Sequence, residues 1–222
     1  MALSPLGEVR ARIGKAAALA GRPAGDVTLI AVSKTQPAEA IGTLVAQGQR
    51  DFGENRVQEA EAKWPELLAR HPDLRLHLIG RLQSNKAEQA VALFDAVHSL
   101  DRPSLATALA RAMEKKGRRP DCFIQVNIGD EPQKGGCPVA GLPALLEAAQ
   151  AARLPVAGLM CIPPEGVEAA PYFALLAKLA RRHGLAGLSM GMSADYESAV
   201  MCGASHVRIG TALFGPRGSA YG

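Results

Sequence analysis

Short apolar runs alternate with longer amphipathic stretches along the whole chain. Eight runs have the length and apolar character of buried strands, and they cover residues 28–33, 50–54, 76–80, 96–100, 122–128, 156–162, 187–191 and 206–210. Between them, helix-forming stretches cover 37–48, 55–70, 85–94, 103–117, 141–152, 168–183 and 195–203. This alternation predicts right-handed crossover connections and a parallel sheet that helices cover on both faces.

The number of strand–helix units distinguishes between two α/β folds. Eight units in 222 residues predict a closed (β/α)8 TIM barrel, which would use nearly the whole chain. An open doubly wound sheet is the alternative, but no G-x-G-x-x-G follows the first strand and no acidic residue is placed to bind a ribose. We therefore expect one barrel domain over residues 1–222.

The first twenty residues, MALSPLGEVRARIGKAAALA, carry a separate signal. Charged residues interrupt this stretch too often for the apolar core of a signal peptide, and a transit peptide is a weaker alternative. Its apolar residues recur at helical spacing instead: Leu3, Leu6, Val9, Ile13 and Ala17. We expect an extra amphipathic helix ahead of the barrel.

Composition and charge narrow the classes of partner. The chain is 48% apolar with a net charge of +4, and no apolar run approaches membrane-spanning length. Lysines and arginines are scattered without a basic block, so we expect neither a membrane nor a nucleic acid as partner. The four cysteines and five histidines lack metal-ligand spacing, which indicates free thiols in a reducing cytoplasm and no metal site.

Candidate chemistry lies where the predicted strands end, because barrel sites form at the carboxyl ends of strands. Lys34 ends the run TLIAVSK, and Gly- and hydroxyl-rich segments follow the last two strands at 190–193 and 208–211. Such loops commonly bind phosphate in barrels, and a partly desolvated lysine becomes a nucleophile toward carbonyls. The sequence thus predicts a phosphorylated aldehyde as ligand, with a solvated or ion-paired Lys34 as the alternative.

Motifs in nearly every strand resemble one family. The segments AVSKTQP (31–37), FGENRVQEA (52–60), HLIGRLQSNK (77–86), VHSLDR (97–102), QVN (125–127), GLM (158–160), SMGMSADYESAV (189–200) and VRIGTALFG (207–215) resemble the YggS/PROSC family of pyridoxal phosphate homeostasis proteins. The resemblance implies a barrel similar to the alanine racemase N-terminal domain. It also implies pyridoxal 5'-phosphate bound as an aldimine to Lys34.

The resemblance further implies roles for seven other residues. Ser193, Gly210 and Thr211 would hold the phosphate, Arg208 would face the pyridine nitrogen, and Asn55, His77 and Met160 would line the pocket. The alternatives are purely structural roles: Asn55 would cap the helix that follows it, and His77 would be a core histidine bonded to a backbone carbonyl. The chain departs from the family at Gln36, where many members carry a second lysine.

Three functions are compatible with this site. The resemblance favours a carrier and buffer of pyridoxal phosphate in vitamin B6 homeostasis, without strong turnover, with pyridoxal-phosphate-dependent apoenzymes as acceptors. The alternatives are an amino-acid racemase and a Schiff-base aldolase acting on a sugar phosphate. Only seven residues follow Gly215, so we expect no additional domain that would supply the racemase with a second acid–base group. We also expect a cytoplasmic monomer.

Overall fold

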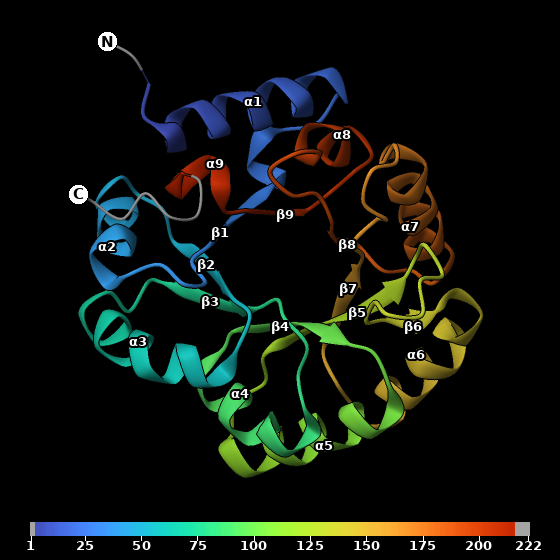
Figure 1. Cartoon of the computed structure of the whole chain (residues 1–222). Helices are drawn as coiled ribbons and strands as arrows, with labels where there is room; N and C mark the ends of the chain where they lie inside the picture. Colours follow the sequence, from blue (N-terminus) through green and yellow to red (C-terminus); the bar gives the residue numbers. More distant parts are fainter. Residues whose placement is uncertain (1–2, 216–222) are drawn as a thin grey trace.

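Eight parallel strands close into a barrel in the computed structural model, which describes residues 3–215 (Figure 1). The strands are β1 (Thr28–Val32), β2 (Asp51–Glu54), β3 (Arg75–Leu78), β4 (Ala96–Leu100), β5 (Asp121–Asn127), β7 (Val156–Met160), β8 (Gly187–Ser189) and β9 (His206–Ile209). They lie in the order β4-β3-β2-β1-β9-β8-β7-β5, and pairing of β4 with β5 closes the ring. The predicted (β/α)8 barrel is confirmed, and each predicted strand overlaps an observed one.

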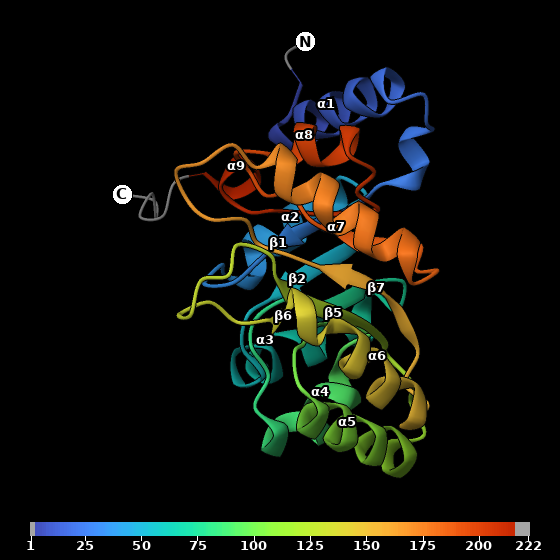
Figure 2. The ribbon, with the colours of Figure 1, turned by 90° about the vertical axis from the view of Figure 1, so that its right-hand side faces the viewer.

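A short strand that the sequence did not predict lies outside the ring. β6 (Cys137–Pro138) pairs in parallel with the end of β5 through Val126 and Asn127. It follows the loop-like stretch 129–136. Figure 2 shows that this loop and the loop after β7 project beyond the strands on the same side of the barrel. They therefore lie at the carboxyl ends of the strands, where the site is expected.

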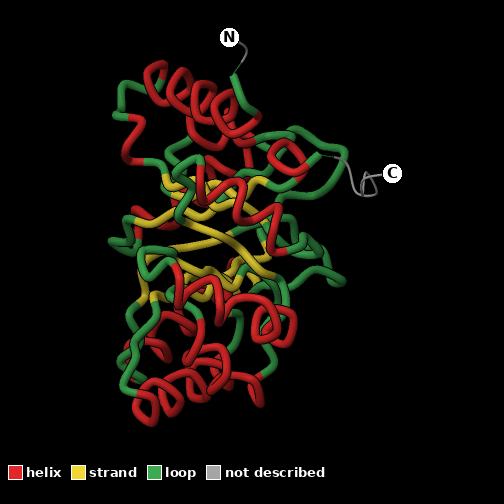
Figure 3. The backbone as a smooth tube through the Cα atoms, turned by 90° about the vertical axis from the view of Figure 1, so that its left-hand side faces the viewer, coloured by secondary structure: helices red, strands yellow, loops and turns green. Residues whose placement is uncertain are grey.

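Helices form the outer ring, as the tube in Figure 3 shows. They are α2 (Ala38–Ala46), α3 (Val57–Arg70), α4 (Ala87–Leu93), α5 (Pro103–Lys116), α6 (Leu142–Ala151), α7 (Ala170–Arg182), α8 (Tyr196–Met201) and α9 (Thr211–Phe214), with 3-10 turns at η1 (Ala24–Asp26), η2 (Ser84–Lys86) and η3 (Val139–Gly141). Helix α5 illustrates the local logic: it starts at a proline, buries Leu105 and Leu109, and ends at Gly117 with a left-handed φ of 65°.

The extra helix at the start of the chain is confirmed as α1 (Pro5–Leu19). The Ser4 hydroxyl oxygen accepts a hydrogen bond from the backbone N–H of Gly7 at 3.2 Å and so caps the helix. Leu3 precedes this cap and is 59% exposed. The prediction that Leu3 belongs to the apolar face of this helix is therefore wrong. The helix packs against α8 and α9 (Figure 1), which are too short to cover their strands alone.

Polar side chains occupy part of the barrel interior, where most barrels carry branched aliphatic layers. His77, His98, Ser189 and Arg208 are all buried on inward-facing strand positions. Glycine on neighbouring strands makes room for the rings: a Cβ on Gly187 would lie 2.8 Å from the Phe123 ring. That ring stacks on His98 with centroids 4.4 Å apart. Helices of the described residues are all too short or too polar to cross a membrane.

Candidate functional site at the carboxyl end of the barrel

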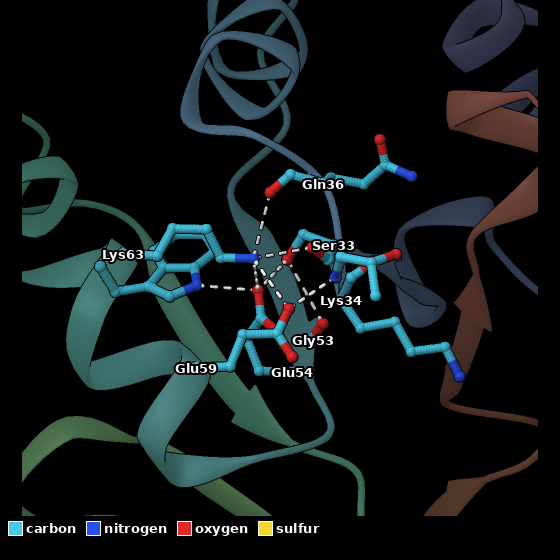
Figure 4. A network of polar contacts seen from close by, with 9 residues as sticks. Ser33, Lys34, Gln36, Gly53, Glu54, Glu59 and Lys63 are labelled. Atoms are coloured by element: carbon cyan, nitrogen blue, oxygen red, sulfur yellow. Dashed lines mark hydrogen bonds and ion pairs between the residues drawn. The ribbon is translucent and has the colours of Figure 1, made fainter. Parts of the chain in front are cut away.

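Lys34 follows β1 directly, at the mouth of the barrel. The preceding residue, Ser33, points outward, because its hydroxyl donates a hydrogen bond at 2.8 Å to Glu54 Oε1, beneath helix α3. Successive side chains of an extended segment point to opposite faces. Figure 4 shows the Lys34 side chain directed away from the contacts around Glu54. The predicted nucleophile therefore leaves the strand on the side opposite to α3.

A buried ion pair anchors the backbone before Lys34. The Glu54 side chain is fully buried, and its Oε1 lies 2.8 Å from the Lys63 ammonium and accepts a 3.0 Å hydrogen bond from the Trp64 indole. Lys63 also donates to the carbonyl oxygens of Ser33 at 2.9 Å and Gln36 at 3.3 Å (Figure 4). Because a buried carboxylate needs charge and hydrogen-bond partners, this arrangement ties α3 to the turn that carries Lys34.

The turn itself holds a strained residue. Thr35 has a φ of 62°, a left-handed conformation that costs a β-branched residue about 1–3 kcal/mol. Its N–H donates to Glu59 Oε1 at 2.6 Å, and the Gln36 N–H donates to the Ser33 carbonyl at 3.0 Å. These bonds hold the conformation that the local sequence disfavours. Gln36, the departure from the family pattern, thus contributes its backbone to the turn.

The predicted phosphate residues lie on two adjacent loops. The loop after β8 runs beside β9, because Met190 N–H donates to the His206 carbonyl and Arg208 N–H donates to the Gly191 carbonyl, at 3.0 and 2.9 Å. Ser193 follows in this loop. A Cβ on Gly210 would lie 3.4 Å from Val32, so the loop after β9 approaches the end of β1. The loops that carry Ser193, Gly210 and Thr211 and the turn that carries Lys34 therefore occupy one part of the rim.

Arg208 lies deeper in the barrel and is 4% exposed. Its Nη1 donates to Ser189 Oγ at 2.7 Å, and its Nη2 donates to the carbonyl of Cys161 at 2.9 Å. Burial lowers the pKa of the guanidinium, yet arginine titrates so far above neutrality that the group stays a cation. No carboxylate of residues 3–215 forms an ion pair with it. Its remaining N–H groups suit a lone pair or an anion.

The three predicted pocket-lining residues have different surroundings. Met160 ends β7 fully buried and is paired in register with Ser189. Asn55 is partly exposed after β2, and a Cβ on Gly80 would lie 2.2 Å from its carbonyl oxygen. The cap of α3 is Arg56, without a side-chain capping bond, so the helix-cap alternative for Asn55 is wrong.

His77 is buried in β3, with side chains as its partners. Its Nε2 lies 3.0 Å from Asp51 Oδ1, and its Nδ1 lies 3.1 Å from His98 Nε2. The alternative of a histidine bonded to a backbone carbonyl is therefore wrong in its choice of partner. Its role as a lining residue stays a prediction.

Sequence reasoning missed two groups of residues. One is the pair Lys63 and Trp64 of α3, which bind the Glu54 carboxylate outside the inner face of the barrel strands. The other comprises His98, Ser189 and Asp51, which contact His77 or Arg208 directly or through one another. Their signal was present: polar residues at alternate positions of apolar strands face the barrel interior.

Histidines from three strands converge inside the barrel. The ring centroids of His77 and His98 are 5.2 Å apart, and that of His206 lies 6.1 and 5.9 Å from them. Burial lowers the pKa of His98 well below its usual value and lowers the pKa of His206 to about 4. Even so, residues 3–215 contain no cluster of histidine, cysteine or acidic side chains that could hold a metal ion.

Comparisons with known proteins connect this geometry to relatives. A family model of the alanine racemase N-terminal domain matches residues 6–218. The pyridoxal phosphate homeostasis protein of Pseudomonas aeruginosa is 46% identical over 221 residues, which cover 96% of this chain and 94% of that protein.

Solved structures show the same likeness. PipY from Synechococcus elongatus, solved with PLP bound, is 44% identical with a TM-score of 0.76 and covers 91% of this chain and 100% of its own. Alanine racemase of Clostridium difficile is 14% identical with a TM-score of 0.67, over 88% of this chain and 54% of its own. At this low sequence identity, the likeness to alanine racemase shows a shared fold.

Proposed function

The chain belongs to the family of pyridoxal phosphate homeostasis proteins, and on this premise we propose that it binds pyridoxal 5'-phosphate covalently through Lys34 and carries or buffers it within the cell. The observation that carries the proposal is the placement of Lys34. The Glu54–Lys63 anchor and the strained turn at Thr35 fix its backbone at the barrel mouth, beside the loop that carries Gly210.

The donor set around the mouth fits this cofactor. Ser193, Thr211 and the backbone at Gly210 would bind the phosphate, since hydroxyl and N–H donors on these loops suit an anion. Arg208 would donate to the pyridine nitrogen. When bound, pyridoxal phosphate supplies an aldehyde that condenses with a primary amine and a ring that withdraws electrons from it. Asn55, His77 and Met160 would border the ring.

Arg208 also bears on whether the protein is a carrier or an enzyme. A buried guanidinium that keeps its proton disfavours protonation of the ring nitrogen, and this weakens the electron withdrawal that amino-acid chemistry needs. The proposed protein therefore stores and transfers the cofactor with little turnover. We propose the cytoplasm as its location, a monomer as its state and pyridoxal-phosphate-dependent apoenzymes as its acceptors.

Covalent trapping tests the site. Purified protein is mixed with pyridoxal phosphate, its visible spectrum is recorded, and borohydride reduction is followed by peptide mass mapping. We expect a yellow protein and a pyridoxyl mass on Lys34. Lys34→Ala is expected to remove both signals, whereas the control Lys86→Ala, at another loop after a strand, is expected to retain them. Label spread over several lysines, or label unchanged in Lys34→Ala, would refute the assignment.

Turnover distinguishes the carrier from an enzyme. Loaded protein is incubated with single amino-acid enantiomers, and the products are separated by chiral chromatography. We expect no accumulation beyond that seen with Lys34→Ala. Sustained, Lys34-dependent conversion would overturn the carrier function while leaving the binding site intact.

A further inference from the structure

A continuous chain of hydrogen bonds crosses the barrel interior from its amino-terminal rim to Arg208. Asp51 Oδ1 lies 3.0 Å from His77 Nε2, and His77 Nδ1 lies 3.1 Å from His98 Nε2. His98 Nδ1 lies 2.8 Å from Ser189 Oγ, which accepts from Arg208 Nη1 at 2.7 Å. Four strands, β2, β3, β4 and β8, thus supply one side chain each, and β9 supplies the arginine.

The carboxylate and the guanidinium at its ends, together with neutral imidazoles between them, fix the direction of every bond in the chain. A guanidinium donates but does not accept, and a carboxylate accepts but does not donate. A neutral imidazole donates from one nitrogen and accepts at the other. His77 must therefore carry its proton on Nε2 to reach Asp51, and its Nδ1 then accepts from Nε2–H of His98.

The remaining bonds follow from the same rule. His98 Nδ1 accepts from the Ser189 hydroxyl, whose oxygen accepts from Arg208. Burial lowers the pKa of His98 well below its usual value, so its ring is neutral as this scheme requires. Both histidines therefore carry their proton on Nε2. In each of the four hydrogen bonds the donor lies on the Arg208 side and the acceptor on the Asp51 side.

We propose that Asp51, His77, His98 and Ser189 are positioning residues, which form a one-directional chain that holds Arg208 in the orientation it presents to the cofactor. Each dipole in the chain turns its negative end toward the guanidinium. This arrangement stabilises a buried cation that lacks an ion pair within residues 3–215, and it fixes Nη1 on the Ser189 side. The proposal rests on the proposed function in one respect: the cofactor is the group that Arg208 faces.

The outer end of the chain is in contact with solvent. Asp51 is 23% exposed and helps to line a cavity of about 460 Å³ at the amino-terminal ends of β1 and β2. The inner end is closed, because Ser189 is fully buried. Charged and titratable groups near the cluster of His77, His98 and His206 are Asp51 from β2, Arg75 from β3 and Arg208 from β9.

Histidine tautomers test the chain without any ligand. Long-range proton–nitrogen correlation spectra of nitrogen-15 protein distinguish protonated from unprotonated ring nitrogens, and His→Gln variants assign the five histidines. We expect neutral rings with Nε2–H at both His77 and His98. A proton on Nδ1 of either ring at neutral pH would overturn the directional chain.

Spectra of the loaded protein test the positioning of Arg208. We compare His98→Gln with His206→Gln, because His206 is in the same cluster but hydrogen-bonds Ser205, outside the chain. The readout is the pH at which the visible absorption of the bound cofactor changes. We expect a shift of about one pH unit or more in His98→Gln, the size produced by moving a nearby charge, and a smaller shift in His206→Gln.

Ser189→Ala keeps the test decisive if His98→Gln does not fold, because it removes a single oxygen atom and is expected to shift the same midpoint. Equal shifts in the chain variants and in His206→Gln, or no shift in either, would overturn the positioning role. Expected tautomers in a protein that takes up no pyridoxal phosphate would support the directional chain and refute the proposed function.

Discussion

Replacing Lys63 with methionine measures how strongly the buried ion pair holds the turn that carries Lys34. Methionine retains much of the apolar stem but removes the ammonium that lies 2.8 Å from Glu54. The carbonyl oxygens of Ser33 and Gln36 lose a donor in the same step. Within residues 3–215, the fully buried side chain of Glu54 then keeps the neutral donors of Ser33 and Trp64 as its hydrogen-bond partners.

The expected magnitude follows from this burial. Removing one partner of a buried ion pair costs about 3–5 kcal/mol, because the other charge stays in the interior without compensation. We expect Lys63→Met to lower the free energy of unfolding by about 4 kcal/mol. For a chain of this length, that corresponds to a fall in Tm of roughly 8–16 °C.

Urea denaturation and thermal unfolding measure the loss, with Lys115→Met as the matched control. Lys115 pairs with Glu88 at 2.9 Å, but the two side chains are 65% and 48% exposed, so its removal should leave the free energy of unfolding nearly unchanged. The double variant Glu54→Gln/Lys63→Met should recover most of the loss, because no charge then remains buried. Equal small losses for Lys63→Met and Lys115→Met would refute the reasoning.

Three further predictions concern the loops, the histidines and the phosphate site. Gly191→Ala should lower the free energy of unfolding by about 2 kcal/mol or more in urea denaturation, since Gly191 has a φ of 93° and the new Cβ would lie 2.5 Å from that of Ala199. The control Gly21→Ala should cost only about 1 kcal/mol, because Gly21 has a φ of 67° but open space around it. Burial holds the pKa of His206 at about 4 in the folded state, below its unfolded value near 6.5, so the free energy of unfolding should fall as pH drops from about 6.5 to 4. His206→Gln should flatten this dependence in unfolding curves recorded across the same pH range. Ser193→Ala should weaken retention of pyridoxal phosphate in equilibrium dialysis by roughly tenfold or more, the value of one hydrogen bond to a charged group; unchanged affinity would place the phosphate elsewhere.

The architecture was predictable because its signal repeats. Each apolar run gave a strand within one or two residues, and helical spacing gave α1 and most of the ring. The failures are local. Leu3 has the right spacing for α1, yet Ser4 caps the helix one residue later and leaves it outside. The two-residue strand β6 has no pattern of its own, because its pairing depends on where β5 ends.

The candidate site was only partly predictable, for a reason of geometry. Carboxyl-terminal strand ends predict Lys34 and the phosphate loops, since the barrel places all such ends on one rim. Asp51 starts its strand at the other rim, so no rule about loops selects it. Its connection to Arg208 runs through His77, His98 and Ser189, and the last two lie on β4 and β8, which are not neighbours in the sheet and face each other only across the closed barrel. A sequence gives the alternation of these positions but not the register between strands.

The packing of α1 on α8 and α9 constrains how the protein reaches its folded state. Leu6, Val9 and Ile13 are synthesised before the helices that pack on α1, which come from residues 196–214. Until those residues leave the ribosome, this apolar face lacks the two helices that pack on it, and the pairing of β1 with β9 cannot form. Contacts of such large sequence separation slow folding. Closure of the barrel between β1 and β9 therefore has to wait until residues 206–209 have been synthesised.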